Sequence, residues 1–352
     1  MECNHGMNTI VLIGGLALGR TPYDGETMKN QLFLERFQQL GYKVIAVDTL
    51  HWSKRPWVML QLLWVLFRYK DAKFVISASL SCRHLIHFIY RLPVHYCYYD
   101  WAIGGGLADH ISNGRYSIAA LSECERVIVE GERLAKQLRK FGLSNVVTVS
   151  NFKPVDYHPI LEERNTSAPF RFVFLSRIIA DKGIPEIFQA VKILLDGKSS
   201  DFIVDFYGIV DMDYEKEFNE SLAEFANVNY RGFLDFFKDE KAYEVLSSYD
   251  CMLFPTYWKG EGFPGIVIDA SIAGLPLIAT DWNLNRDYIK DGETGYLIPI
   301  HDAARLAAKM EQVMSADFGL LAMRRRCVTE AQQYDYRNVI SKELMQELGF
   351  ND

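Results

Sequence analysis

The sequence lacks the cysteine patterns of a metal centre or a disulfide framework. Its six cysteines are scattered, without a Cys-x-x-Cys pair, so we expect a chain that works in the reducing cytoplasm. It also lacks an apolar run of roughly 20 residues, the length that a membrane-spanning helix needs. Residues 1–6 are polar and glycines interrupt the apolar run over residues 9–18, so no signal peptide is expected. Short-period repeats and low-complexity segments are missing as well.

Charge is unevenly divided between the two halves of the chain. Of its 352 residues, 49% are hydrophobic and 24% charged, which is typical of a soluble globular protein, and the length suits two domains. The net charge is −7, but residues 1–150 hold 17 Lys and Arg against 12 Asp and Glu (+5), while the remainder holds 21 against 33 (−12). This split argues against a nucleic-acid partner. It permits the basic half to face an anionic surface such as a membrane.

Strands and helices alternate through both halves. A first strand over residues 9–18 contains the pair Gly14-Gly15, a helix is predicted over residues 28–40, and a second strand over residues 42–48. The Gly-x-Gly-x-x-Gly fingerprint of dinucleotide sites is absent from this βαβ start. The same alternation restarts at residue 170. We therefore predict an α/β protein with two Rossmann-like doubly wound domains facing a cleft.

A stretch with several prolines and no periodicity separates the two halves, and it sets the predicted domain boundaries. We expect an N-terminal domain over residues 1–152, a linker over 153–169, a C-terminal domain over 170–330, and a C-terminal helix over 331–352 that packs back on the N-terminal domain.

Residues 56–69 form a predicted helix that is apolar almost all round. At about 14 residues it is too short to span a bilayer. Basic residues flank it at Lys54-Arg55 and at Arg68 and Lys70. Two interpretations stay open, namely a helix buried in or at the edge of a domain, and a helix that lies on a membrane surface through residues 54–70.

The stretch from Glu261 to Asp269 is organised around a helix start between two acidic residues. Pro264 is predicted at the first helical position, where its missing N–H costs nothing, and Gly262 and Gly265 allow close approach of a ligand or another backbone. Helical spacing places Asp269 at the edge of the buried stripe, where a carboxylate rarely lies without a partner. A helix N-terminus can bind an anion while the acids accept hydrogen bonds from hydroxyls, which indicates a nucleotide-sugar site.

Arg177 and Lys182 lie five residues apart in a loop that follows a predicted strand. Two cations at this position can clamp a diphosphate, Arg through its planar fork and Lys as a point charge. A solvated loop is the alternative for these two residues taken alone. The helix start at residues 264–267 favours the clamp, because its backbone N–H groups predict an anion in the same half of the chain.

A series of motifs runs in order through residues 170–314. They are Phe174-Leu-Ser-Arg177, Lys182-Gly183, Phe188-Gln-Ala190, Pro255, Glu261-Gly-Phe-Pro-Gly265, Asp269-Ala, Gly274-Leu-Pro276-Leu-Ile and Asp291-Gly-Glu-Thr-Gly295-Tyr-Leu. Together they resemble the retaining glycosyltransferase family 4, within the glycosyl transferases group 1. In the first half the likeness is limited to Asp24-Gly25 and Gly41-Tyr-Lys-Val44. The resemblance implies a GT-B fold, no metal and no cofactor, and a UDP- or GDP-sugar donor held mainly by the second domain.

Carried over residue by residue, the resemblance implies that Arg177 and Lys182 bind the donor diphosphate and that Glu261 faces the donor sugar. These three residues are the candidates for catalysis. Asp269 would accept hydrogen bonds from the ribose hydroxyls, and Gly25 would give room at the other wall of the cleft. The backbone contacts with the phosphates and sugar would come from Gly262, Phe263, Pro264, Gly265, Ile266 and Val267.

Two positions depart from the family pattern. Asp269 stands where the family usually has Glu, and the shorter side chain keeps the same acceptor chemistry. Where the family often has His after the fourth strand, this chain has Tyr99-Asp100-Trp101, which makes Asp100 a candidate for the acceptor side or the cleft wall. The glycines at 104–106 either admit a substrate or form a turn.

The reaction implied by the resemblance is front-face transfer, with retention, of a sugar from a nucleotide diphosphate to an acceptor hydroxyl. A glycosidase is disfavoured because a diphosphate clamp has no purpose in the hydrolysis of a neutral glycoside. A sugar-nucleotide epimerase using Asp100 and His95, and a non-catalytic nucleotide-sugar-binding subunit, remain as alternatives. The basic half predicts a glycan or lipid-linked acceptor of bacterial capsule, exopolysaccharide or lipopolysaccharide synthesis, at the inner face of the cytoplasmic membrane.

Overall fold

The computed structural model describes residues 8–19, 25–77, 96–102, 104–236, 241–315 and 319–350. The chain divides into two compact units. Unit 1 consists of Met1–Pro154 with Tyr334–Asp352, and unit 2 of Val155–Gln333. Each unit contains one six-stranded sheet, and neighbouring strands pair in parallel in both sheets. The predicted α/β class is therefore confirmed.

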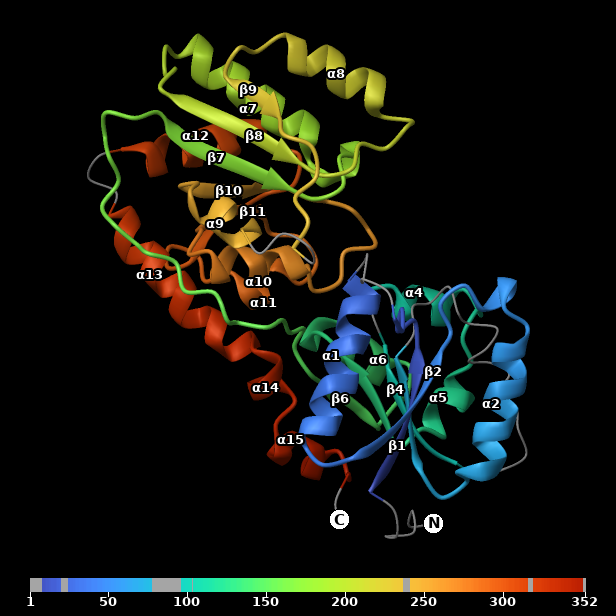
Figure 1. The fold of residues 1–352 in the computed structure, drawn as a ribbon. Coiled ribbons are helices and arrows are strands. Elements are labelled where there is room, and N and C mark those ends of the chain that lie inside the picture. The colour runs from blue at the N-terminus through green and yellow to red at the C-terminus, as the bar shows by residue number, and fades with distance from the viewer. Residues whose placement is uncertain are drawn as a thin grey trace. The chain divides into compact units, whose positions relative to one another are not determined.

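The sheet of unit 1 has the strand order β2-β1-β3-β4-β5-β6. Figure 1 labels β1, β2, β4 and β6 of this sheet. The order reverses between β1 and β3, which makes the carboxyl ends of these two strands the switch point where open α/β sheets bind ligands. The strands are β1 (Thr9–Gly14), β2 (Lys43–Asp48), β3 (Lys73–Ser77), β4 (Cys97–Trp101), β5 (Arg126–Val129) and β6 (Val146–Thr148).

Alternate residues of β1 face two different cores. Val11 and Ile13 pack in a core with helices α2, α4, α5 and α6, whereas Ile10 and Leu12 pack in another core with α1. Both faces are covered, and residues 10–13 of β1 are accordingly all apolar. The helices of this unit that precede the C-terminal segment are α1 (Gly25–Gln39), the 3-10 turn η1 (Trp52–Lys54), α2 (Trp57–Arg68), α4 (Leu107–Ser112), α5 (Ile118–Ser122) and α6 (Glu132–Lys140).

Helix α2 buries only one of its faces. Its buried residues are Val58, Leu62, Val65 and Leu66, and its exposed apolar residues are Trp57 (58% exposed), Leu60 (69%), Leu63 (45%), Trp64 (57%) and Phe67 (84%). The helix is therefore not fully buried, and the interpretations as a helix at the edge of a domain and as a membrane-surface helix both stay predictions. Across the residues described, no helix combines the length and the apolar character that crossing a bilayer requires.

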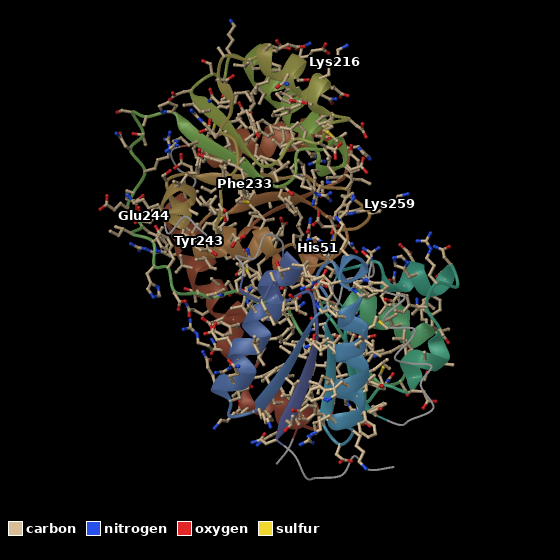
Figure 2. All side chains as sticks on the ribbon, turned by 45° about the vertical axis from the view of Figure 1, so that its right-hand side comes forward. His51, Lys216, Phe233, Tyr243, Glu244 and Lys259 are labelled. Carbon is tan, nitrogen blue, oxygen red and sulfur yellow. The ribbon has the colours of Figure 1, made fainter. Side chains whose placement is uncertain are left out.

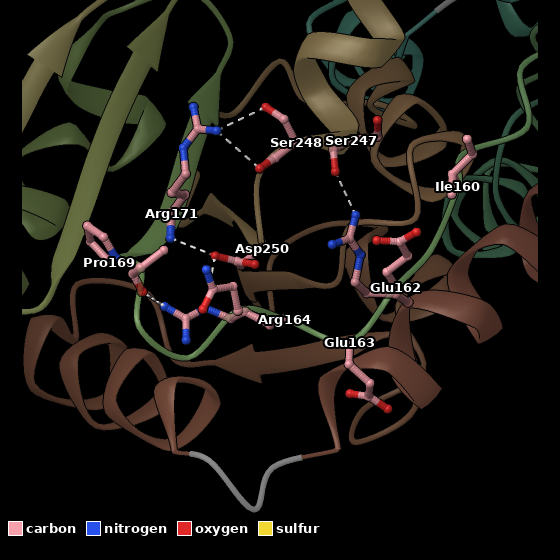
Figure 3. A pocket seen from close by; sticks show the side chains of 12 residues that line it. Ile160, Glu162, Glu163, Arg164, Pro169, Arg171, Ser247, Ser248 and Asp250 are labelled. Atoms are coloured by element: carbon pink, nitrogen blue, oxygen red, sulfur yellow. Dashed lines mark hydrogen bonds and ion pairs between the residues drawn. The ribbon is translucent and has the colours of Figure 1, made fainter.

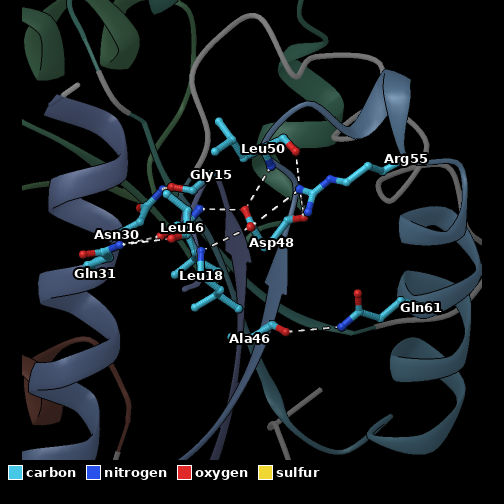
Figure 4. A network of polar contacts seen from close by, with 11 residues as sticks. Gly15, Leu16, Leu18, Asn30, Gln31, Ala46, Asp48, Leu50, Arg55 and Gln61 are labelled. Atoms are coloured by element: carbon cyan, nitrogen blue, oxygen red, sulfur yellow. Dashed lines mark hydrogen bonds and ion pairs between the residues drawn. The ribbon is translucent and has the colours of Figure 1, made fainter. Parts of the chain in front are cut away.

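The loop after β1 is tied to the end of β2 by one carboxylate. Asp48 accepts hydrogen bonds from the backbone N–H groups of Leu16 at 2.9 Å, Leu18 at 3.4 Å and Leu50 at 3.0 Å (Figure 4). Arg55 lies 3.6 Å from the same carboxylate and donates to the Asp48 carbonyl at 3.1 Å. These bonds hold residues 16–18 beside the end of β2, at the carboxyl edge of the unit 1 sheet.

The sheet of unit 2 has the order β12-β11-β10-β7-β8-β9 and reverses between β7 and β10 (Figure 1). Phe170, Phe172 and Phe174 alternate along β7 and share a core with helices α7, α8 and α12. The strands are β7 (Phe170–Leu175), β8 (Phe202–Tyr207), β9 (Val228–Tyr230), β10 (Cys251–Phe254), β11 (Leu277–Thr280) and β12 (Gly295–Ile298). The helices are η3 (Ala180–Lys182), α7 (Ile184–Asp196), α8 (Glu215–Ala223), α9 (Ala242–Ser247), α10 (Gly265–Ile272), α11 (Asn285–Tyr288), α12 (Ala303–Met314) and α13 (Leu320–Ala331).

The C-terminal segment forms short helices where one helix was predicted over residues 331–352. After the turn η4 (Gln332–Tyr334), α14 covers Tyr336–Val339 and α15 covers Lys342–Glu347. The helix breaks because Ser341 caps α15, its hydroxyl accepting from Leu344 N–H at 3.2 Å. The segment packs on α1, where Arg36 Nε donates to the Ile340 carbonyl at 2.9 Å.

Candidate functional site

The candidates of unit 2 gather at the carboxyl ends of β7 and β10, where the strand order reverses. Arg177 and Lys182 follow β7, and Glu261 lies in the loop after β10. Between η3 and α7 the chain turns at Gly183, with a φ of 80°. A Cβ at Gly183 would overlap the carbonyl oxygen of Pro255, directly after β10. Glycine is therefore required here both for the backbone conformation and for the close approach of the two loops.

Lys182 and Glu261 form an ion pair inside this group of loops. Their side chains are 5% and 8% exposed, and the ammonium contacts Glu261 Oε2. Thr256 donates its buried hydroxyl to the same oxygen at 3.1 Å. Burial lowers the pKa of Lys182, an effect to which the charge of Arg177 adds and which Glu261 opposes. The structure thus brings together two of the three candidates for catalysis from separate loops.

The loop that carries Glu261 is held from the end of β11. Trp282 donates its indole N–H to the Trp258 carbonyl at 3.0 Å, and the Asn283 side chain donates to the Glu261 carbonyl. Glu261 N–H in turn donates to the Trp258 carbonyl at 3.1 Å. Three hydrogen bonds therefore fix the backbone on both sides of the carboxylate.

Trp258 was not among the predicted site residues. Its ring lies 4.8 Å from Arg177 Cζ and 4.8 Å from Lys182 Nζ, so a single indole contacts both cations of the predicted clamp. No pattern in the sequence signals this contact, because it depends on how the loops after β7 and β10 meet.

Helix α10 begins one residue later than predicted. Pro264 is its N-cap, with an extended backbone (φ −70°, ψ 118°), and Gly265 is the first helical residue. The prediction of Pro264 at the first helical position is therefore wrong by one residue. Within the predicted contact segment, Gly262, Gly265 and Ile266 are partly exposed, and Phe263, Pro264 and Val267 are buried. The backbone N–H groups of Gly265 and Ile266 belong to the first turn of α10 and have no intrahelical acceptor. Because these two residues are partly exposed, their N–H groups are the ones nearest to solvent.

Asp269 lies inside α10 and is 3% exposed. Tyr243 of α9, labelled in Figure 2, donates its hydroxyl to Asp269 Oδ1 at 2.8 Å. Burial, followed by the charge of Asp269, raises the pKa of Tyr243 well above its ordinary value, so the phenol remains a donor. Tyr157 stacks on Tyr243 with 5.6 Å between ring centroids. The expected partner of the buried carboxylate is thus a tyrosine that sequence reasoning missed.

The two candidates of unit 1 lie at different depths. Gly25 is the first residue of α1, and a Cβ there would meet no atom within 4 Å in the described part of the chain. Asp100 lies within β4, which pairs with β5 as far as Trp101, and it is 5% exposed. The prediction that Asp100 follows the end of this strand is therefore wrong. Its role, like that of Gly25, stays a prediction, and His95 lies outside the described residues.

A buried ion pair that the sequence did not signal lies at the carboxyl edge of unit 1. Lys29 of α1 contacts Glu130, which follows β5, and their side chains are 5% and 6% exposed. Among the described residues, no three His, Cys, Asp or Glu side chains are grouped as metal ligands. Metal independence stays a prediction.

A hollow of about 440 Å³ lies at the opposite end of the unit 2 sheet, where β7 and β10 begin (Figure 3). Its charged lining residues are Arg164, Arg171, Arg324, Glu162, Glu163 and Asp250. Arg164 Nε lies 3.4 Å from Asp250, and Arg324 donates to the Ser247 carbonyl at 2.7 Å. Three cations face three acids, so the hollow has no net charge to attract an ion, and we assign it no ligand.

Both sheets have a doubly wound strand order, which reverses between β1 and β3 in unit 1 and between β7 and β10 in unit 2. Two such sheets are those of the GT-B fold. HepE of Anabaena in complex with UDP has a TM-score of 0.71 at 11% identity, covering 97% of this chain and 99% of that chain. The apo form of the lipopolysaccharide outer core galactosyltransferase WaaB has a TM-score of 0.68 at 15% identity, covering 94% and 96%. At these identities the likeness shows the fold alone.

Residues 160–334 match the family described as glycosyl transferases group 1, and through this segment the chain belongs to that family. Among curated proteins, the capsular polysaccharide biosynthesis glycosyltransferase CapM of Staphylococcus aureus is 28% identical over 207 residues, which is 56% of this chain and 52% of CapM. The chain therefore spans about half the length of this curated relative. Membership of family 4 stays a prediction.

Proposed function

We propose that the protein is a retaining glycosyltransferase that moves a sugar from a UDP- or GDP-sugar to an acceptor hydroxyl, without a metal or a cofactor. The observation that carries this proposal is the buried pair of Lys182 and Glu261 beside the start of α10, with Arg177 on the same loop as Lys182. It places two cations, a carboxylate and a helix N-terminus at one switch point of the sheet.

The proposed chemistry separates the roles of these groups. The bond from the anomeric carbon to the β-phosphate oxygen breaks, and a bond from that carbon to the acceptor oxygen forms on the same face. Arg177, Lys182 and the N-terminus of α10 stabilise the charge that develops on the leaving diphosphate. Glu261 faces the donor sugar and the positive charge that builds on its anomeric carbon, and the acceptor proton passes to the diphosphate.

The nucleoside is proposed to bind farther along α10, where Asp269 accepts hydrogen bonds from the ribose hydroxyls. For the acceptor we propose a glycan or lipid-linked glycan of bacterial surface polysaccharide synthesis. The name of CapM, a capsular polysaccharide biosynthesis glycosyltransferase, supports this class. Gly25, with open space around it, and the carboxyl edge of the unit 1 sheet are proposed to receive the acceptor.

Membrane contact through residues 54–70 is a further part of the proposal. The exposed face of α2 presents two tryptophans and a phenylalanine, and Lys54, Arg68 and Lys70 flank it in exposed positions. Aromatic side chains with neighbouring cations fit the interface of an anionic bilayer. We therefore propose that the protein works at the inner face of the cytoplasmic membrane. Flotation with liposomes tests the membrane contact, and the absence of salt-sensitive association would contradict it.

A panel of UDP- and GDP-sugars tests the enzyme activity. Chromatography measures the release of UDP or GDP. The first assays contain no acceptor and detect slow hydrolysis of the donor, and the next contain glycan and lipid-linked acceptors. We expect one nucleotide class to turn over, Glu261→Ala to lose about 10² to 10³ of the rate, and NMR of the product to show the anomeric configuration of the donor. Equal turnover by Glu261→Ala would remove Glu261 from the mechanism, and an inverted product would contradict retention.

A further inference from the structure

Trp258 is the one aromatic ring shared by both cations of the proposed clamp, within the described ranges. Its ring lies 4.8 Å from Arg177 Cζ and 4.8 Å from Lys182 Nζ. Arg177 is exposed, and no carboxylate of the described residues lies within the 4.0 Å ion-pair distance of its guanidinium. Lys182 is the cation that already has Glu261 as a partner. The contact that Arg177 and Lys182 have in common is therefore the indole.

A ring acts on two like charges differently from a carboxylate. The negative face of an indole attracts a cation, but the ring carries no net charge. The ring thus holds two cations that repel each other near one point, and it adds no charge to that of Glu261, which pairs with Lys182. An anion that arrives there meets the charge of Arg177, which a carboxylate in place of the ring would cancel.

The backbone of Trp258 is held by its own loop and by the loop after β11. Trp258 N–H donates to Thr256 Oγ1 at 3.3 Å, and its carbonyl accepts from Trp282 Nε1 at 3.0 Å. Gly260 lies against the ring, since a Cβ at that position would come 2.7 Å from one of the indole carbons. A side chain at residue 260 would therefore push the ring off its present place.

We infer that Trp258 is a positioning residue for the donor diphosphate, and that it acts by holding Arg177 and Lys182 against one ring, where both can reach the diphosphate. This inference rests on the proposed function, because it takes the diphosphate of a nucleotide sugar as the anion. It adds a residue that selects for the diphosphate part of the donor and leaves the nucleoside part to Asp269.

The test compares a diphosphate ligand with a monophosphate ligand. UDP and UMP (or GDP and GMP, whichever pair the parent protein binds) are titrated by calorimetry into the parent, Trp258→Leu and Trp258→Phe. We expect Trp258→Leu to weaken the diphosphate about five- to tenfold and the monophosphate less, and Trp258→Phe to fall between. Lys259→Ala is the matched control, because it removes an exposed cation from the neighbouring position of the same loop. It should change neither affinity by more than about twofold.

The possible results separate the inference from the proposed function. An unchanged ratio of diphosphate to monophosphate affinity in Trp258→Leu overturns the inference and leaves the function standing. A loss as large in Lys259→Ala, or a drop in thermal stability that Trp258→Phe shares, overturns it too. If the parent binds no nucleotide, inorganic pyrophosphate is the probe. Tight pyrophosphate binding that depends on Trp258 supports the inference while contradicting the nucleotide donor, and no binding at all contradicts both.

Discussion

The ammonium of Lys182 and the carboxylate of Glu261, 79 residues apart in the chain, form an ion pair in which neither side chain is more than 8% exposed. Two buried charges are compatible with a stable fold only while they are paired with each other. A buried charge without its partner lowers the free energy of unfolding. The pair therefore has two separable consequences. It joins the loops after β7 and β10, and it holds the two groups that the proposed mechanism uses at one point.

Removing one partner should cost stability. Glu261→Gln leaves the buried ammonium without a counter-charge, and we expect the free energy of unfolding to fall by about 3 kcal/mol. The double variant Lys182→Met with Glu261→Gln should regain much of this loss while remaining inactive. Urea unfolding of each variant measures the effect.

The matched control is an exposed pair of the same unit. Lys216 and Glu220 lie 3.8 Å apart on α8 with side chains 88% and 69% exposed, and Glu220→Gln should cost less than about 1 kcal/mol (Lys216 is labelled in Figure 2). Similar losses in Glu261→Gln and Glu220→Gln would show that the buried pair does not support the fold.

As the pH is raised, donor binding should weaken at a lower pH than it would if Lys182 had the pKa of an ordinary lysine. Burial lowers the pKa of Lys182 from its usual 10.5, so the ammonium loses its proton below that value. In the window between the lowered pKa and 10.5 the unfolded chain binds more protons than the folded one, so the free energy of unfolding rises with pH. The affinity for UDP or GDP changes in the opposite direction, because a neutral amine no longer attracts a diphosphate.

Calorimetric titrations at increasing pH check this, with Lys182→Arg as the comparison. A guanidinium keeps its charge throughout this range, so the variant should show no loss of affinity in the window. An affinity of the parent that stays flat up to 10.5 would contradict the role of Lys182.

The sequence predicted the site residues whose role can be recognised from their neighbours in the chain, and it missed those whose partners lie far away in the chain. Arg177, Lys182 and Glu261 were found because strand ends and helix starts are visible in the residue pattern, and parallel strands bring their carboxyl ends to one edge. Tyr243 and Trp258 were missed because their partners come from other loops and helices, which no periodicity reveals. Asp100 was placed beyond a strand that in fact continues to Trp101, since the ends of elements are the least certain part of such predictions.

The same limit applies to larger elements. The two doubly wound α/β domains followed from alternation, because short connections and right-handed crossovers leave few arrangements for such a chain. The C-terminal helix was predicted as one piece, whereas α14 ends at Val339 and the cap formed by Ser341 starts α15. Helix α2 is apolar almost all round, so its sequence did not show which face packs against the core and which face is exposed.

Tyr243 should determine how the protein discriminates ribose from deoxyribose. Its hydroxyl donates to Asp269 Oδ1, so Tyr243→Phe removes one hydrogen bond that orients the carboxylate, and a hydrogen bond to a charged group contributes about 1.5 to 3 kcal/mol. We expect the parent to bind UDP or GDP more tightly than the 2′-deoxy and 3′-deoxy forms, and Tyr243→Phe to lose most of that preference. Calorimetry with both sets of ligands forms a double-mutant cycle between protein and sugar.

Tyr157→Phe is the control for that experiment. It keeps the ring that stacks on Tyr243 and loses the hydroxyl that lies 2.8 Å from Ser247 Oγ. It should leave the preference unchanged. A preference that survives in Tyr243→Phe, or that Tyr157→Phe also loses, would show that Tyr243 does not orient Asp269.

The exposed face of α2 should decide membrane association. Trp57, Trp64 and Phe67 are each more than half exposed on one helix, and their replacement by Ser removes the apolar contact while Val58 and Leu62 keep the helix packed. We expect the triple variant to stay in the lower fractions when the parent floats with liposomes that contain anionic lipid. The parent should float less at high salt, because the flanking cations are screened. Activity on a water-soluble acceptor should be unchanged in the variant, whereas activity on a bilayer-embedded acceptor should fall. If the variant floats as well as the parent, α2 is not the contact, and if both stay unbound at low salt, the membrane proposal fails.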